Sequence, residues 1–350
     1  MTLQEFVLAG QWVFLAYFVG INLGYLMQNV IAAFGIRRYL QTADQYEAEN
    51  VFSALDIPIS LVVPAYNESA SIITSVKAML QLEYPQYELI VVNDGSTDDT
   101  LQKLIDEFDM QEFPEAYRAR VESKPVKSVY RSTRIANLRV VDKVNGGSKA
   151  DASNAGINVC RYPLVCVVDA DSVLQPDSLR RVVRPFLEDP TTVAVGGTVR
   201  IANGCTVRQG FLEKVGLPGN FLALVQVVEY LRAFLFGRMG WSPINGLLII
   251  SGAFGLFHKE TLVEAGGYNP DAVGEDMELV LRLHRLMKQK RRPYRITFVP
   301  DPVCWTDAPE NYRDLKGQRV RWQHGLGQAL ALNRSLLTNP RGGAVTWVSI

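Results

Sequence analysis

Apolar and polar segments alternate along this 350-residue chain, and the first apolar segment is much longer than the others. Residues 6–36 contain no charged side chain. A helix needs roughly 20 apolar residues to cross the hydrocarbon core of a bilayer, so this run is long enough to span one. Arg37 and Arg38 follow it directly, and basic residues mark the cytoplasmic flank of a membrane helix. We interpret residues 1–36 as a transmembrane helix with a cytoplasmic downstream side; a buried core helix is the alternative.

Shorter apolar runs in the middle of the chain predict strands, and the segments between them predict helices. Continuous apolar runs that end in turn residues are typical of strands buried in a parallel sheet. Strands that alternate with helices imply an α/β fold, in which helices cover both faces of a parallel sheet. The predicted strands are residues 59–64, 87–92, 140–141, 164–168 and 193–201, and the predicted helices are residues 69–82, 97–108 and 149–159.

The flanking segments divide the chain further. Residues 37–57 are polar with mixed charge, which suits an amphipathic linker at the membrane interface, and residues 58–335 form the cytoplasmic domain. The apolar segment 221–236 is interpreted as lying along the bilayer surface or covering the active site, with a core helix as the alternative. Residues 276–292 predict an amphipathic helix with a basic end. Residues 336–350 turn apolar, which predicts the start of a further membrane segment in a longer protein.

Composition excludes several classes of protein. Lysine plus arginine and aspartate plus glutamate both number 36, and a nucleic-acid-binding protein usually has a basic excess. The four cysteines form no Cys-x-x-Cys pair, so a structural zinc is disfavoured and a reducing cytoplasm fits. The first strand is not followed by Gly-x-Gly-x-x-Gly, and no Gly-x-x-x-x-Gly-Lys-Ser segment is present. A nicotinamide or flavin dehydrogenase and a P-loop enzyme are therefore disfavoured.

Polar side chains follow three of the predicted strands, at residues 64–68, 93–96 and 169–171. In an open α/β sheet, ligands bind beyond the carboxyl ends of the strands. Asp169 and Asp171 come directly after a buried strand, where both carboxylates can turn toward one Mg²⁺ or Mn²⁺ ion. Such an ion bridges phosphate oxygens and neutralises a diphosphate leaving group. The alternative is a turn whose two acids are simply solvated.

Other candidate residues also have structural alternatives. Asp94 is placed to hold a ribose, or else to cap the helix that follows. Glu275 and Asp276 open a predicted helix, where acids favourably meet the helix dipole without any further role. Arg321 and Trp322 supply a cation for a diphosphate and an aromatic face for a sugar ring.

The order of these motifs resembles that of the family 2 glycosyltransferases, specifically the processive membrane synthases of cellulose, chitin, hyaluronan and poly-N-acetylglucosamine. The resemblance covers about residues 57–330 and implies a GT-A-type nucleotide-sugar-binding fold with a parallel or mixed sheet. It implies a donor site at Pro64, Tyr66, Asn67, Glu68, Asp94, Lys149 and Asp169, a metal site at Asp169 and Asp171, a general base at Asp276, and an acceptor or diphosphate site at Ser251, Gly252, Glu275, Gln318, Arg321 and Trp322.

The chain departs from the family pattern at three positions. Ser148 is inserted before Lys149, and Ser153 stands where leucine is common. Gly274 replaces the threonine that usually precedes the two acids.

The resemblance implies an inverting, metal-dependent transferase that uses a UDP-sugar to elongate a polysaccharide at the inner face of the plasma membrane. Asp276 then takes the proton from the acceptor hydroxyl. The implied partners are the nucleotide-sugar, a glycan acceptor, membrane lipid, and export or accessory subunits, with no nucleic acid. One alternative is a non-processive transferase that adds a single sugar to a lipid carrier. Another is a catalytically silent membrane sensor of nucleotides or glycans.

Overall fold

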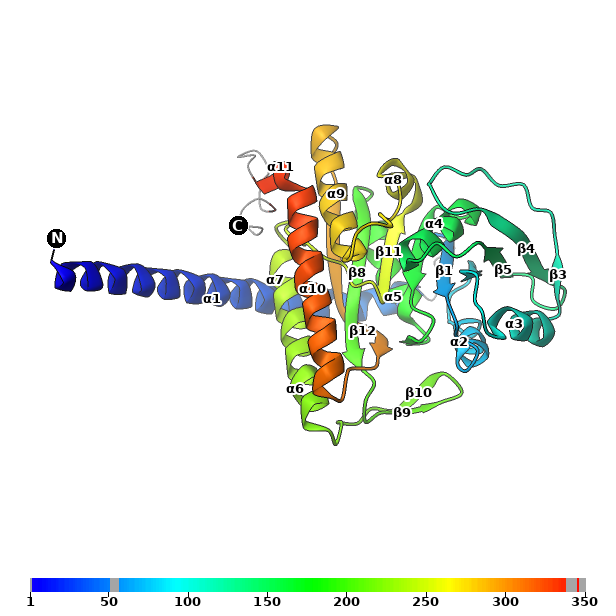
Figure 1. The fold of residues 1–350 in the computed structure, drawn as a ribbon, viewed down its shortest axis with the longest axis horizontal. Coiled ribbons are helices and arrows are strands. Elements are labelled where there is room, and N and C mark those ends of the chain that lie inside the picture. Colours follow the sequence, from blue (N-terminus) through cyan, green and yellow to red (C-terminus); the bar gives the residue numbers. More distant parts are fainter. Residues whose placement is uncertain (1, 51–56, 338–344, 346–350) are drawn as a thin grey trace.

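The computed structural model describes residues 2–50, 57–337 and 345, and it places a long helix beside a mixed α/β domain (Figure 1). Helix α1 (Leu3–Asn50) extends away from the domain as a rod. Its segment Gln4–Gln41 has a mean hydropathy of 1.7 and is, by length and composition, apolar enough to cross a membrane. Its most apolar window has no buried residue. The alternative of a core helix is therefore wrong, because the domain would cover such a helix.

The two predicted boundaries around the domain have different outcomes. Helix α1 continues past Arg37 to Asn50, so most of the predicted linker is helical, and residues 51–56 lie outside the described residues. At the other end, α11 (Arg334–Leu337) and the single residue Val345 are all that is described of the last apolar segment. The prediction of a further membrane segment there remains a prediction.

The centre of the domain is a ten-stranded sheet in the order β3-β4-β5-β2-β1-β6-β11-β8-β12-β7. Four neighbouring strands are parallel and are largely those predicted: β5 (Leu138–Lys143), β2 (Tyr87–Asn93), β1 (Ile59–Ala65) and β6 (Leu164–Val168). Consecutive residues of these strands are buried, which means that both faces of the sheet are covered.

The sheet as a whole is mixed, which the family resemblance allowed and which the alternation of strands and helices alone did not indicate. β11 runs antiparallel to both of its neighbours, β6 and β8, and β4 runs antiparallel to β5. Outside the four parallel strands, only β8 was predicted. The additional strands are β3 (Met110–Glu112), β4 (Val126–Ser132), β7 (Val173–Leu174), β8 (Thr192–Ile201), β11 (Phe254–His258) and β12 (Arg295–Thr306).

Helices cover the sheet, and α4 (Lys149–Val159) is the most deeply buried among them, with every residue after Lys149 buried. A Cβ atom on Gly156 would lie 2.4 Å from Cγ1 of Val62 in β1, so only glycine allows α4 to pack this closely on the sheet. The α4 bounds are those predicted. The other helices of the domain are α2 (Ile72–Met79), α3 (Thr100–Phe108), α5 (Ser178–Glu188), α8 (Lys259–Glu264), α9 (Glu275–Gln289) and α10 (Tyr312–Leu332).

A hairpin is followed along the chain by three consecutive helical segments, and the last two of these pack against α1. The hairpin pairs β9 (Thr206–Arg208) with β10 (Phe211–Lys214). It leads into α6 (Phe221–Tyr230), the π-helix η1 (Leu231–Arg238) and α7 (Met239–Trp241). Nε2 of Gln28 in α1 donates a hydrogen bond to the carbonyl oxygen of Gly237 at 3.0 Å, which joins the two parts.

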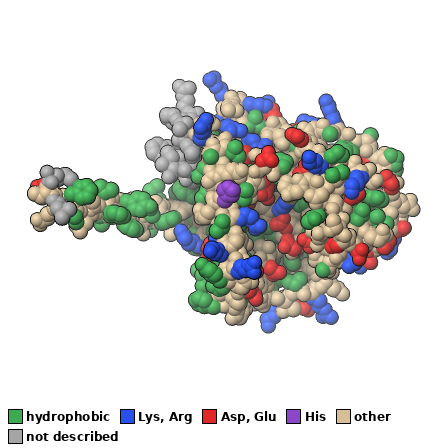
Figure 2. Space-filling model, viewed as in Figure 1, with side chains coloured by type: hydrophobic (Ala, Val, Ile, Leu, Met, Phe, Trp, Pro, Cys, Tyr) green, Lys and Arg blue, Asp and Glu red, His purple; other side chains and the backbone are tan. Residues whose placement is uncertain are grey.

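The face of α6 that points away from the domain is apolar and exposed. The side chains of Phe221 and Val228 are 73% and 65% exposed. Figure 2 shows apolar side chains along the α1 rod and beside α6. The alternative of a core helix for residues 221–236 is therefore wrong.

Candidate active site

The loops after β1 and β2 are tied together by a residue of the predicted donor site. Oδ1 of Asn67 accepts a hydrogen bond from the Thr97 amide at 2.8 Å, and the Asn67 amide donates to Oγ of Ser96 at 3.0 Å. Asn67 has a φ of 56°, a left-handed conformation that asparagine tolerates better than most residues. Next to it, the Glu68 amide donates to Oγ1 of Thr100 at 2.9 Å. The structure thus brings together two of the three polar segments that the sequence predicted at one sheet edge.

The outer residues of this loop are open to solvent. Pro64 is the penultimate residue of β1 and is partly buried, whereas the Tyr66 side chain is 49% exposed. An exposed aromatic ring at the edge of the sheet is free to stack on a flat ligand group.

Asp94 is buried at the end of β2 and faces an ammonium group inside the protein. Its Oδ1 forms an ion pair with Nζ of Lys143 and accepts a hydrogen bond from the Gly146 amide at 3.0 Å. Lys143 is fully buried and also pairs with Asp151. Sequence reasoning assigned no role to Lys143 or Asp151, because no motif marks them and Asp94, which Lys143 also binds, is distant in the chain.

The capping alternative for Asp94 is wrong. Helix α3 begins at Thr100, and its amide donates to Oδ1 of Asp98 at 3.0 Å. The N-cap of this helix is Asp99, and Asp98, one residue before it, binds the first amide of the helix.

Lys149 connects two predicted parts of the site. Its Nζ forms an ion pair with Asp169 and donates to the carbonyl oxygen of Gly252 at 2.7 Å. Burial on its own would lower the pKa of Lys149, but attraction to Asp169, Glu275 and Asp276 raises it above the ordinary value. The ammonium is therefore charged at neutral pH.

The inserted Ser148 has a structural role. Its Oγ accepts a hydrogen bond from the Asp151 amide at 3.3 Å, so Ser148 is the N-cap of α4. The cap makes Lys149 the first residue of the helix, at the end nearest the acids. Ser153, the second departure, donates its hydroxyl to the Lys149 carbonyl oxygen at 2.9 Å.

Asp169 and Asp171 lie in the turn that follows β6. Burial raises the pKa of Asp171, and the charges of Asp169 and Glu68 raise it further. Within the described residues, no cluster of three or more His, Cys, Asp or Glu side chains forms a complete metal cage. Two adjacent carboxylates nevertheless fit Mg²⁺ or Mn²⁺, because Mg²⁺ usually binds one or two carboxylates and completes its shell with waters and substrate phosphates.

Asp276 lies at the start of α9, where Gly252 joins it to Lys149. Oδ2 of Asp276 accepts a hydrogen bond from the Gly252 amide at 3.0 Å, and Oδ1 accepts one from the Met277 amide at 2.8 Å. A Cβ atom on Gly252 would be 3.6 Å from both Nζ of Lys149 and Oδ2 of Asp276, and 3.7 Å from Oε1 of Glu275. Gly252 is therefore the point where the predicted diphosphate and base residues converge.

Burial governs the acidity of these two carboxyl groups. It raises the pKa of Asp276 above the ordinary value for an aspartic acid, against the hydrogen bonds from Met277 and Gly252. It raises the pKa of Glu275 as well, with a further contribution from the charge of Asp276. Ser251, predicted with Gly252 at the acceptor end, lies in the same turn, and its carbonyl oxygen accepts from the Phe254 amide at 3.1 Å.

Helix α10 contacts the residue before Glu275, but among the described residues no hydrogen bond or ion pair joins the three predicted residues of α10 to this cluster. Gly325 of α10 touches Gly274, which directly precedes Glu275. Arg321 is exposed, and Oε1 of Gln318 is buried without a hydrogen-bond partner among the described residues. The guanidinium of Arg319 lies 4.4 Å from the centroid of the Trp322 ring, so it covers one face of that ring.

Arg238 is a cation near the site that sequence reasoning missed. Its guanidinium lies 3.6 Å from the centroid of the Phe234 ring, and its Nη1 atom is buried without a hydrogen-bond partner among the described residues. Burial lowers the pKa of Arg238 to about 10, although the charge of Asp276 acts to raise it. The sequence did not indicate Arg238 because it lies at the end of a mostly apolar segment and belongs to no recognisable motif.

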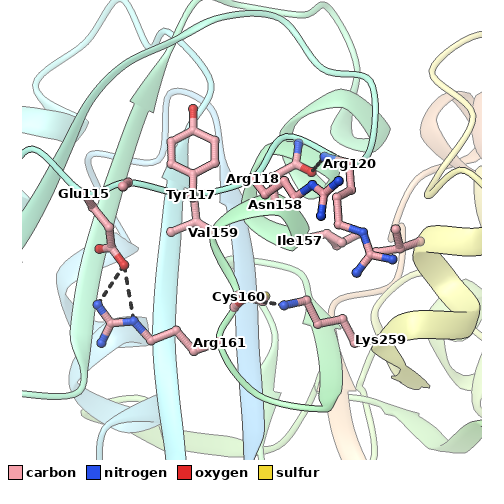
Figure 3. A pocket seen from close by; sticks show the side chains of 12 residues that line it. Glu115, Tyr117, Arg118, Arg120, Ile157, Asn158, Val159, Cys160, Arg161 and Lys259 are labelled. Carbon is pink, nitrogen blue, oxygen red and sulfur yellow. Dashed lines mark hydrogen bonds and ion pairs between the residues drawn. The ribbon is translucent and has the colours of Figure 1, made fainter.

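A pocket of about 340 Å³ lies elsewhere and contains none of the predicted site residues (Figure 3). It is bounded by the C-terminal end of α4 and the start of α8. In Figure 3, Arg161 contacts Glu115, and Lys259 contacts the Cys160 backbone. Arg161 and Lys259 already bind protein partners, and the pocket lies apart from the predicted site residues, so it is not part of the site described above.

The structure thus gathers acids and a lysine at the carboxyl edge of a mixed α/β sheet, and a comparison with protein families gives the class of protein to which this arrangement belongs. The family model described as "Glycosyltransferase like family 2" matches residues 57–325, which is well over half of the chain. The chain therefore belongs to this family and is a glycosyltransferase. This confirms the resemblance drawn from the motifs.

Among curated proteins, the chain is 28% identical over 304 residues to a poly-beta-1,6-N-acetyl-D-glucosamine synthase of Staphylococcus epidermidis, covering 83% of this chain and 63% of the relative. A synthase of the same name from Staphylococcus aureus is 28% identical over 267 residues, covering 76% and 54%. The chain thus spans less than two thirds of the length of these relatives.

Among solved structures, the mannosyltransferase PcManGT of Pyrobaculum calidifontis, in complex with GDP-Man and Mn²⁺, aligns with a TM-score of 0.59 and 19% identity. The alignment covers 93% of this chain and 80% of that chain. It confirms the predicted fold class.

Proposed function

We propose that this protein transfers a sugar from a UDP-sugar to a glycan acceptor with inversion at the anomeric carbon. The observation that carries the proposal is the convergence of Lys149, Asp169 and Asp276 around Gly252. A cation and a buried carboxylate so close together suit a reaction that separates a diphosphate from a sugar while removing a proton.

Asp276 is the proposed general base. Two backbone amides orient its carboxylate, and burial makes it more basic than an exposed aspartate. It removes the proton from the acceptor hydroxyl as the hydroxyl oxygen bonds to the anomeric carbon. The bond between that carbon and the diphosphate oxygen breaks on the opposite face, and the nucleoside diphosphate leaves.

The donor is held by the residues at the sheet edge. Lys149 stabilises the negative charge that develops on the diphosphate, and Arg321 provides a second cation on α10. Asp169 and Asp171 hold Mg²⁺ or Mn²⁺, which neutralises the leaving group when bound. The nucleoside lies against Pro64, Tyr66, Asn67, Glu68 and Asp94.

The product is proposed to be a polysaccharide, and N-acetylglucosamine is the first donor sugar to test. The names of the Staphylococcus relatives support both points. Helix α1 crosses the plasma membrane, and the exposed apolar face of α6 lies on the lipid surface beside it, with the catalytic domain in the cytoplasm. Export or accessory subunits complete the machinery.

The test is to incubate membranes containing the full chain with radiolabelled UDP-sugars, UDP-N-acetylglucosamine first, and to separate polymer, lipid-linked sugar and free donor. Polymer supports the proposal. A single sugar on lipid favours the non-processive alternative, and binding without transfer favours a sensor.

The base assignment has its own test. Asp276→Asn keeps the size of the side chain but removes its basicity, and a general base contributes a factor on the order of 10²–10⁴. We expect turnover to fall by that factor while UDP affinity, measured by calorimetry, stays within about twofold. Near-normal turnover in Asp276→Asn would exclude Asp276 as the base.

A further inference from the structure

Two glycines bring α10 into backbone contact with the residue that precedes the acids of α9. A Cβ atom on Gly325 would lie 2.9 Å from both the Cα and the N of Gly274. A Cβ atom on Gly274 would lie 3.2 Å from Cα of Gly325. A Cβ atom at Gly325 would force the backbones to shift, and one at Gly274 would be tighter than ordinary contact, so the departure at Gly274 suits the close approach of the two backbones.

One side chain of α10 also hydrogen-bonds to the loop that leads into α9. Oε1 of Gln328 accepts from the Val273 amide at 2.8 Å, and its Nε2 donates to the Asp271 carbonyl oxygen at 2.9 Å. The same amide group thus binds the loop on both sides of Ala272. Together with the Gly274–Gly325 contact, these bonds hold the start of α9 against α10.

Asp276 depends on this arrangement, because it is the second residue of α9 and bonds to Gly252 on the opposite side. The start of α9 therefore lies between Gly252 and α10. We propose that Gly325 and Gln328 are positioning residues, which hold Asp276 against Gly252 at the distance that proton transfer requires. This inference rests on the proposed role of Asp276 as the base.

The same contact sets the place of the α10 motif relative to the base. Arg321 precedes Gly325 by four residues, which is about 6 Å along a helix axis. A shift of α10 away from Gly274 would therefore move Arg321 and Trp322 relative to the start of α9. The contact makes the two helices one unit on the acceptor side of the site.

The chain offers a matched control for testing this unit. Gly325→Ala and Gly327→Ala both replace a glycine of α10 with the best helix-forming residue, and nothing lies within 4 Å of a Cβ atom at Gly327. We expect Gly325→Ala to lower kcat on the order of 10²-fold, because a misplacement of about 1 Å can cost that much. We expect Gly327→Ala to keep wild-type kcat, and both variants to keep UDP affinity within about twofold.

Gln328→Met tests the hydrogen bonds without adding volume at the contact. It removes the acceptor of the Val273 amide, so hydrogen exchange of that amide in the full chain is expected to accelerate, and kcat to fall about threefold to tenfold. Gln328→Glu restores the acceptor oxygen and is expected to recover the protection of Val273. This exchange readout does not depend on activity, so it remains informative if Gly325→Ala fails to fold.

The outcomes separate the positioning role from the proposed function. If wild type transfers sugar, Asp276→Asn does not, and kcat of Gly325→Ala equals that of Gly327→Ala, the positioning role is wrong and the base assignment stands. Unchanged exchange of Val273 in Gln328→Met overturns it as well. If Asp276→Asn is fully active, the proposed function itself has failed.

Discussion

At the scale of single residues, burial decides how the carboxyl groups around Gly252 behave. The Asp276 carboxyl group is more basic than an exposed aspartate because it is covered, while Lys149 and Arg238 oppose this shift with their positive charges. The acidity of Asp276, the proposed base, is therefore shifted by two cations that come from different parts of the chain. One of them belongs to the helix α4, and the other to the π-helix beside α1.

The first prediction concerns the pH dependence of transfer. Asp276 acts as a base only when ionised, so kcat/KM must fall as the pH drops through its raised pKa, above the ordinary range for aspartic acid. Removing the nearby cation in Arg238→Met should raise that pKa and move the acidic limb to higher pH. Arg232→Met is the control, because Arg232 lies on the same π-helix but stacks on Tyr25 instead. An acidic limb that stays in place in Arg238→Met contradicts the prediction.

A second prediction concerns the paired acids after β6. Asp171→Ala removes one of two carboxylates that fit a divalent cation, so Mg²⁺ or Mn²⁺ should no longer strengthen UDP binding. The measurement is UDP affinity by calorimetry with the metal and with a chelator. Wild type should bind more tightly with the metal, and Asp171→Ala should bind equally in both. A metal effect of normal size in the variant rules out Asp171 as a ligand.

At the scale of elements, the loops after the parallel strands are held by polar groups that the strands themselves bring together. Lys143 at the end of β5 binds Asp94 after β2 and Asp151 in α4. A fully buried ammonium between two carboxylates links three elements at one point. The donor side of the site therefore depends on an ion-pair cluster in the interior as well as on the exposed loop.

The third prediction tests that cluster. Lys143→Met leaves two buried carboxylates without their cation, and breaking a buried pair in this way costs about 3–5 kcal/mol of unfolding free energy. Lys127→Met is the control, because Lys127 is half exposed and pairs with Asp142 at 3.4 Å, which is worth at most about 1 kcal/mol. Denaturant unfolding of both variants checks this. Equal loss in the two would show that the buried cluster contributes no more than a surface pair.

At the scale of the whole molecule, α1 and α6 present apolar side chains on the same side of the catalytic domain. Gln28 of α1 bonds to Gly237, and a Cβ atom on Gly240 would lie 2.4 Å from Cγ of Gln28. Helix α1 is therefore packed directly on the segment that carries Arg238. Helix η1, which ends at Arg238, contacts α1 and directly follows α6 in the chain.

The fourth prediction follows from this arrangement. The full chain should remain in the membrane pellet after alkaline carbonate washing, because residues 4–41 supply a span-length apolar helix. Deleting residues 2–26 leaves Gln28 in place but removes most of that length, so the variant should move largely to the wash. Immunoblotting of pellet and supernatant measures the distribution. Full retention of the deletion variant would mean that α1 is not the anchor.

The sequence alone determined the elements whose signal is local. The apolar runs of β1, β2 and β6 can be seen in the sequence because nearly all of their residues are buried on both faces of the sheet, and the strand-end rule then located Asp94, Asp169 and Asp171 at one edge. The order of motifs, together with their family resemblance, added Lys149 and Asp276. The family and the fold class followed from these residues before any contact was known.

Only the tertiary structure decided what lies between those residues. β11 enters the sheet antiparallel, which places Gly252 between Lys149 and Asp276, and no local pattern signals that direction. Lys143 and Arg238 became visible as partners because ion pairs and burial join residues distant in the chain. The contact of Gly325 with the residue before α9 depends on how α10 crosses α9, and no local sequence pattern indicates that crossing.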